Sequence, residues 1–216
     1  MKVKTAAIFV DNANDYSKGL AKFFKESFIK GGGKIVSEEA FMAGDKDYRT
    51  QLTKIKMKNP AFLYVPAYYQ EDGLVAQQAR ELGINIPMGG GDGWDSPDLV
   101  KIAGESALNK IYFSNHYSVD SKNPLSMAYV KEYTATYNMP PDALAALGYD
   151  AAIIMVEAIK KAKSVEPAKV RDAMAKLKVA GVCGVVTFDK NRNPVKSAVI
   201  IELKNGKQTY NSTVNP

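Results

Sequence analysis

The sequence has little of the material from which catalytic and metal-binding sites are usually built. Among its 216 residues there is one cysteine, Cys183, and one histidine, His116. A single cysteine excludes a disulfide within the chain. One cysteine and one histidine are also too few for a Cys/His metal site. Neither residue stands in a signature of a nucleophile or base, and the Gly-x-Ser-x-Gly elbow of hydrolases is absent. We therefore expect a protein that is not an enzyme and needs no metal or cofactor, with His116 as a surface or hinge residue.

Long apolar runs and blocks of like charge are also missing. No apolar run approaches the roughly 20 residues that a membrane-spanning helix requires. The net charge is +6, but the lysines are spread through nearly every segment and alternate with acidic residues, which indicates a solvated surface and no nucleic-acid partner. Residues 1–4 lead directly into an apolar stretch, without the h-region or cleavage site of a signal peptide. Either the protein is cytosolic, or the start of the gene lies outside this sequence.

The first half of the sequence alternates short apolar runs with amphipathic stretches, a pattern typical of βαβ units around a doubly wound parallel sheet. Asp15 can cap the first helix, and Gly31 to Gly33 can end it. Strands are expected at residues 5–10, 34–41, 61–65, 84–88 and 110–114. Helices are expected at residues 15–30, 47–58, 71–82 and 97–103.

The second half has a different pattern. Three helices are expected in succession, at residues 125–137, 141–162 and 167–177, with no strand between them. Strands at 185–188 and 198–203 follow, separated by a polar turn at 189–194. The pattern therefore changes after the strand expected at residues 110–114.

The ends of the expected parallel strands carry the residues that could form a binding site, since ligands of open α/β sheets bind beyond the carboxyl ends of the strands. Tyr16 follows the first strand, Tyr68 follows the third, and Gly91 and Asp92 follow the fourth. Asp92 can accept charge-assisted hydrogen bonds from an ammonium group. The two tyrosines can line an apolar wall, and a glycine lets the backbone approach a ligand closely. These residues predict a small ligand with a cationic group and an apolar side chain.

Each of these assignments has a structural alternative. Tyr16 lies on the apolar stripe of its helix and could belong to the core, Asp92 could cap a short helix, and Trp94 could be a packing residue. The glycine run at 89–93 lacks the Gly-Lys-Ser/Thr ending of a P-loop and the position of a dinucleotide fingerprint. Asp11 as a receiver-like phosphoacceptor lacks its usual second acidic pair and lysine.

Several short segments, in order along essentially the whole chain, resemble the leucine/isoleucine/valine-binding type of periplasmic solute-binding protein, type I. They are residues 7–12, 15–20, 44–48, 88–97, 102–105, 141–143, 148–151 and 186–189. In that family, two α/β lobes close around an amino acid. The resemblance implies that residues 1–110 and 186–216 form a complete flavodoxin-like lobe. Residues 111–185 would be the C-terminal part of the other lobe, whose N-terminal part is absent.

The resemblance also implies site residues. It places Asp92 where the family binds the ligand ammonium, beside Gly91, and Tyr16 and Tyr68 where aromatic rings line the side-chain pocket. Leu144 takes a pocket position where a larger aromatic residue is possible.

The expected function is that of the extracytoplasmic substrate-binding component of an ABC transporter for a branched-chain or other small apolar amino acid. It would act in the periplasm or at the extracellular face and deliver its ligand to a membrane permease. The alternative is the ligand-sensing domain of a receptor or regulator with the same fold. Because the helix near residues 143–159 would lack the strands it normally covers, we also expect self-association, as a homo-oligomer or swapped dimer.

Overall fold

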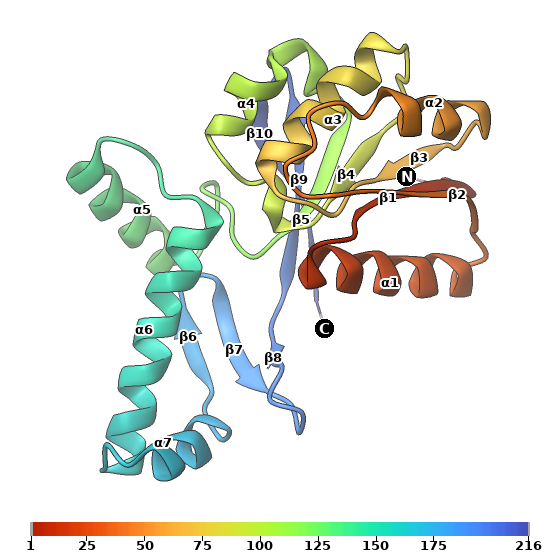
Figure 1. The fold of residues 1–216 in the computed structure, drawn as a ribbon. Helices are drawn as coiled ribbons and strands as arrows, with labels where there is room; N and C mark the ends of the chain where they lie inside the picture. The colour runs from red at the N-terminus through yellow and green to blue at the C-terminus, as the bar shows by residue number, and fades with distance from the viewer. Residues whose placement is uncertain (1, 216) are drawn as a thin grey trace. The chain divides into compact units, whose positions relative to one another are not determined.

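In the computed structural model, which describes residues 2–215, the first half of the chain forms a parallel sheet (Figure 1). Its strands are β1 (Thr5–Asp11), β2 (Lys34–Phe41), β3 (Phe62–Tyr64), β4 (Met88–Gly90) and β5 (Ile111–Asn115). They lie in the order β2-β1-β3-β4-β5, and every pairing between them is parallel. This is the strand order of the flavodoxin-like doubly wound sheet, so the expected fold class is confirmed.

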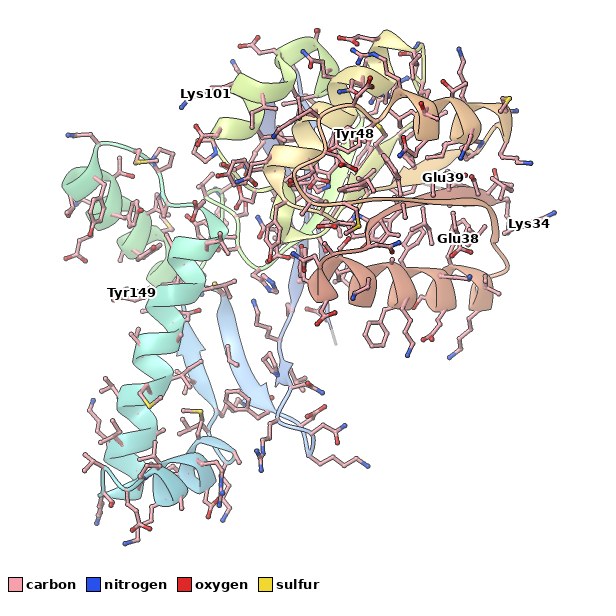
Figure 2. All side chains as sticks on the ribbon, in the orientation of Figure 1. Lys34, Glu38, Glu39, Tyr48, Lys101 and Tyr149 are labelled. Carbon is pink, nitrogen blue, oxygen red and sulfur yellow. The ribbon has the colours of Figure 1, made fainter. Side chains whose placement is uncertain are left out.

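Helices cover both faces of this sheet. They are α1 (Asp15–Lys30), α2 (Arg49–Met57), α3 (Tyr69–Glu81) and α4 (Asp98–Ala103), with short 3-10 helices η1 (Asp92–Trp94) and η2 (Glu105–Ala107). Figure 1 shows α1 on one face and α2, α3 and α4 on the other. An ion pair of 2.6 Å joins Lys25 of α1 to Glu38 of β2, which is labelled in Figure 2. The crossovers bury the sheet between two helical layers.

Asn14, not Asp15, caps α1. Its backbone is extended and its side-chain oxygen accepts a hydrogen bond of 2.9 Å from the amide of Tyr16. Asp15 is the first helical residue, and its carboxylate pairs with Lys18 at 2.7 Å. The expected cap was therefore one residue too late, because both Asn14 and Asp15 are residue types that favour this position.

The fourth strand lies later than expected, at Met88–Gly90 instead of residues 84–88. The guanidinium of Arg80 binds the carbonyl oxygens of Ile84 and Ile86 at 2.6 and 2.9 Å, which holds this segment as a loop. The strand itself is rich in glycine for a steric reason. A Cβ atom on Gly89 would lie 1.5 Å from the carbonyl oxygen of Tyr112 in β5.

The second half contains α5 (Pro124–Tyr137), α6 (Ala143–Ala162) and α7 (Pro167–Met174), in succession as expected. A small antiparallel sheet follows, made of β6 (Val179–Gly181), β7 (Gly184–Phe188) and β8 (Pro194–Val195). The helices and the loops around this sheet share a hydrophobic core cluster, made of Tyr117, Tyr129, Ala146, Val182 and Cys183. The sequence predicted β7 but neither β6 nor β8, which are too short to show a pattern.

Two further strands, β9 (Ala198–Lys204) and β10 (Lys207–Val214), extend the seven-stranded sheet beyond β5. β9 was expected, but β10 is a polar strand that the sequence did not reveal. Along residues 2–215, no helix is both long and apolar enough to cross a membrane.

The chain divides into two compact units. The first contains the residues up to Ser114 together with Ile201–Thr209, and the second contains Asn115–Ile200 and the residues from Tyr210 onwards. The expected division placed residues 186–216 in the first unit and began the second at residue 111. The structure instead places residues 111–114 in the first unit, and residues 186–200 and those from Tyr210 onwards in the second. Residues 186–195 belong there because β7 pairs with β6 and β8 in the small sheet.

Candidate functional site

The carboxyl ends of β1, β3 and β4 bring four of the predicted site residues together within the first unit. Tyr16 lies in the first turn of α1, Tyr68 immediately precedes α3, and Gly91 and Asp92 follow β4. The hydroxyl of Tyr16 donates a hydrogen bond of 2.8 Å to Oδ1 of Asp92. The rings of Tyr16 and Tyr68 stack, with centroids 5.1 Å apart and an interplanar angle of 22°. We refer to Tyr16, Tyr68, Gly91 and Asp92 as the strand-end cluster.

Gly91 gives the cluster its close packing. A Cβ atom at this position would lie 2.6 Å from the hydroxyl of Tyr16, so any larger residue would displace the ring. The next residue but one, Gly93, donates its amide to the same hydroxyl at 3.0 Å. The Tyr16 hydroxyl is therefore held from two sides by the segment that follows β4.

Ser17 links the elements that carry the two tyrosines. Its hydroxyl accepts the amide of Asp11 at 3.0 Å and donates to the carbonyl oxygen of Pro66. Asp11 ends β1, and Pro66 lies between β3 and Tyr68, so one buried side chain joins both strand ends. Ser17 was not predicted as a site residue, although its place one residue after Tyr16 in the first helical turn is a usable signal.

The electrostatic surroundings keep Tyr16 a neutral hydrogen-bond donor. Burial raises its pKa well above the usual range, and the negative charge of Asp92 raises it further. Asp92 is partly exposed, and an ionised carboxylate offers about four acceptor positions, so it can accept from more than one donor at a time. The exposed fraction of Tyr68 is 40%. The cluster thus presents a carboxylate beside an accessible aromatic ring.

The structure decides between the alternative roles that the sequence left open for Trp94 and Asp92. Trp94 is fully buried and its indole nitrogen donates to the carbonyl oxygen of Val65 at 2.9 Å, so it is a packing residue. The N-cap of η1 is Gly91, and the side chain of Asp92 accepts from Tyr16 across the sheet edge. Asp11 accepts the amides of Ala13 and Ala43 through Oδ1, which fixes the loops that follow β1 and β2.

Leu144, the fifth predicted site residue, belongs to a different unit from the strand-end cluster. It stands in the first turn of α6 in the second unit, where its side chain is 58% exposed. Its assignment to the same site stays a prediction from the family resemblance.

Asp72 is a buried residue near this edge that was not predicted from the sequence. It lies in the first turn of α3, is fully buried, and neither of its carboxylate oxygens has a hydrogen-bond partner among residues 2–215. Its amide donates to the carbonyl oxygen of Tyr68 at 2.9 Å. Burial, and secondly the charge of Glu71, raise the pKa of this carboxyl far above its usual value. Its place on the same helical face as Val75 and Ala79 is the signal that could have revealed the burial.

The second unit holds the two residues considered for nucleophilic or base chemistry. Cys183 is buried, and burial raises the pKa of its thiol to about 12, so it is not a ready nucleophile. His116 and Cys183 both line a cavity of about 390 Å³, together with hydroxyl groups of Ser118, Ser126 and Tyr210. In the described part of the chain, no group of three or more His, Cys, Asp or Glu side chains is placed to hold a metal ion.

Comparison with known proteins gives a consistent result over almost the whole chain. The chain is 33% identical to the Leu/Ile/Val-binding protein BraC3 of Rhizobium johnstonii, over 98% of this chain and 51% of that protein. The leucine-binding protein LivK of Thermotoga maritima superposes with a TM-score of 0.93 at 35% identity, covering 99% of this chain and 61% of the other. The branched-chain amino-acid-binding protein LivJ of Streptococcus pneumoniae, solved with isoleucine, superposes with a TM-score of 0.89 at 36% identity. This match also covers 99% of this chain and 61% of the other.

These comparisons also define how much of the relatives this chain represents. It spans about half the length of the curated relatives that it matches. The model of a family described as periplasmic binding protein matches residues 1–208, which is well over half of the chain. Together with the parallel sheet order and the strand-end cluster, this match shows that the chain belongs to the periplasmic binding protein family.

Proposed function

We propose that this chain supplies part of the amino-acid-binding component of an ABC transporter, and that the strand-end cluster is its contribution to the ligand site. The observation that carries the proposal is the 2.8 Å bond from Tyr16 to Asp92 beside the stacked ring of Tyr68. It places an oriented carboxylate next to an aromatic surface, which suits a ligand with an ammonium group and an apolar side chain.

Each part of the cluster has a chemical task in this proposal. Asp92 accepts charge-assisted hydrogen bonds from the ligand ammonium, and the neutral phenol of Tyr16 holds that carboxylate in one orientation. The exposed ring of Tyr68 offers apolar contact to the ligand side chain and a π face to the cation. Leu144 would take part in the side-chain pocket. No bond is made or broken, so the protein acts by binding and not by catalysis.

The relatives support the class of ligand. One is named for leucine, isoleucine and valine, and another was solved in complex with isoleucine. Because this chain spans about half the length of such relatives, we propose that the groups for the ligand carboxylate come from the remaining part of the family fold. Closure of two hinged lobes would then enclose the amino acid, before its delivery to a membrane permease from the periplasm or the extracellular face.

The test is a titration of the chain with a panel of amino acids, monitored by NMR spectroscopy because this method detects binding of millimolar affinity. Leucine, isoleucine and valine are expected to shift the amide signals of Gly91 and Gly93. Asp92→Ala should abolish these shifts, since it removes the partner of the ammonium group. Asp98→Ala changes an acid on α4 outside the cluster and should leave them unchanged. Absence of shifts for every amino acid, or shifts that persist in Asp92→Ala, would sink the proposal.

A further inference from the structure

The segment that carries Asp92 is a single tight turn. The 3-10 helix η1 covers Asp92–Trp94, and the amide of Asp95 donates to the carbonyl oxygen of Asp92 at 2.9 Å. We refer to residues 92–95 as the site turn. A 3-10 helix of this length has few backbone hydrogen bonds of its own. Contacts with other elements therefore determine where the carboxylate of Asp92 stands.

Two of these contacts come from α1 and from the end of β3. The hydroxyl of Tyr16 in α1 accepts the amide of Gly93 at 3.0 Å. The carbonyl oxygen of Val65, directly after β3, accepts the indole N–H of Trp94 at 2.9 Å. These two bonds hold the middle of the site turn, and a third bond holds its last residue.

The third contact comes from β10. Nε2 of Gln208 donates a hydrogen bond of 2.6 Å to Oδ1 of Asp95, and the two residues are 113 positions apart in the sequence. Asp95 is only 7% exposed, so its carboxylate meets Gln208 at the edge of the interior. Hydrogen bonds to a carboxylate are among the stronger ones in proteins. Gln208 thus fixes the end of the site turn, although it is not a member of the strand-end cluster.

β10 is a firm base for this bond. The turn between β9 and β10 is joined to the segment before β5 by two hydrogen bonds between Asn205 and Asn109, of 2.8 and 2.9 Å. Ile201 and Leu203 of β9, the neighbouring strand in the sheet, are buried. Gln208 therefore stands on a strand that is held at its start and along its side.

The first unit ends directly after Gln208 and Thr209, and Tyr210 already belongs to the second unit. The bond to Asp95 thus lies close to a point where the chain passes from one unit to the other. We propose that Gln208 is a positioning residue for Asp92, which it holds through Asp95, and that it links the site turn to this point of passage. The inference rests on the function proposed above, in which Asp92 binds the ligand ammonium.

Hydrogen exchange tests the positioning without any ligand. Gln208→Met keeps the length of the side chain but removes the donor. We expect the amides of Trp94 and Asp95 to exchange at least ~fivefold faster in this variant, because the site turn opens locally more often. The amides of β1 should exchange as in the wild type. Gln208→Lys supplies a new donor to Asp95 and should restore slow exchange.

Lys207→Met is the matched control for the exchange experiment. Lys207 is exposed, and adjacent side chains of a strand point to opposite faces of the sheet, so this variant should exchange like the wild type. Unchanged exchange of Trp94 and Asp95 in Gln208→Met would overturn the inference. Faster exchange throughout the first unit would also overturn it, because it would show a general loss of stability.

The NMR titration with isoleucine tests the effect on binding. The side-chain amide signal of Gln208 should shift together with the signals of Gly91 and Gly93. Gln208→Met should bind isoleucine at least ~threefold more weakly, because the ligand must then order the site turn. Gln208→Lys should bind with about the wild-type affinity.

Two results of the titration would contradict the inference. One is a shift of Gly91 and Gly93 that leaves the Gln208 signal in place, and the other is an equal affinity of Gln208→Met and the wild type. Absence of binding to the wild type would instead contradict the proposed function. The exchange rates, which need no ligand, would then decide by themselves whether Gln208 holds the site turn.

Discussion

Asp150 of α6 accepts a hydrogen bond of 2.8 Å from the backbone amide of Cys183 through Oδ2. Its other oxygen, Oδ1, accepts the amide of Val182 at 2.7 Å. The carboxylate is buried, and a Cβ atom on Gly181 would lie 2.6 Å from it, so the turn between β6 and β7 is built closely around this one side chain. Asp150 is thus the residue that ties α6 to the small sheet of the second unit.

Asp150→Asn should therefore destabilise the second unit. An amide offers one acceptor atom where the carboxylate offers two, and hydrogen bonds to a charged group contribute about 1.5–3 kcal/mol. We expect a loss of that order in the free energy of unfolding, measured by urea denaturation. Asp172→Asn, an exposed change on α7, is the matched control and should cost less than about 0.5 kcal/mol. Equal effects of the two variants would contradict the role assigned to Asp150.

Asp72→Asn should stabilise the protein increasingly as the pH rises. The pKa of Asp72 is higher in the folded chain than its usual value. The contribution of this carboxyl to stability is therefore full when the pH is below the usual pKa of an aspartic acid. The contribution is lost as the pH rises through the folded pKa, because the unpartnered carboxyl must then ionise while buried. The neutral amide does not have this cost.

Thermal unfolding of both proteins between pH 4 and pH 9 measures the difference. We expect a gain for Asp72→Asn that is small at the acid end and grows to more than about 1 kcal/mol at the alkaline end, because only the wild type carries a group whose ionisation is opposed by burial. The exposed change Asp98→Asn should show no comparable growth with pH. A gain that is the same at every pH would show that Asp72 does not retain its proton in the folded chain.

Tyr16→Phe separates the hydroxyl of the strand-end cluster from its ring. The variant keeps the stack on Tyr68 but removes the donor to Asp92 and the acceptor for the amide of Gly93. We expect a loss of about 0.5–1.5 kcal/mol in stability and weaker binding of isoleucine in the NMR titration. Tyr137→Phe, which alters an exposed tyrosine of α5, should change neither quantity. Unchanged stability of Tyr16→Phe would mean that the bond to Asp92 does not form in solution.

Gly89→Ala should disrupt the first unit. The added Cβ atom would lie 1.5 Å from the carbonyl oxygen of Tyr112, and neither backbone can move without breaking the pairing of β4 with β5. We expect a destabilisation of at least about 3 kcal/mol, or no folded protein. Gly19→Ala in α1 is the control, because its Cβ atom meets nothing within 4 Å. It should stabilise the helix by about 0.5–1 kcal/mol. Thermal melts followed by circular dichroism compare the two.

Much of the first unit could be predicted because its signals are local. Apolar runs and helical periodicity located β1, α1, β2 and α2 to within a few residues, and the alternation of strands and helices predicted a parallel sheet. The fourth strand was predicted too early because the side chain of Arg80 binds the carbonyl oxygens of Ile84 and Ile86, which keeps these apolar residues in a loop. The polar strand β10 was missed because most of its residues are exposed, so its sequence lacks apolar alternation.

The sequence by itself determined most elements of the first unit and which residue types stand at the carboxyl ends of its strands, since both depend on neighbours along the chain. Only the tertiary structure decided that Tyr16 meets Asp92, 76 residues away, and that Trp94 is a packing residue. It also decided that the carboxylate of Asp72 is buried with no hydrogen-bond partner among the described residues, and that α6 is open along one side. These features depend on how separate elements pack, and a pattern in one segment does not record what the other segments bring against it.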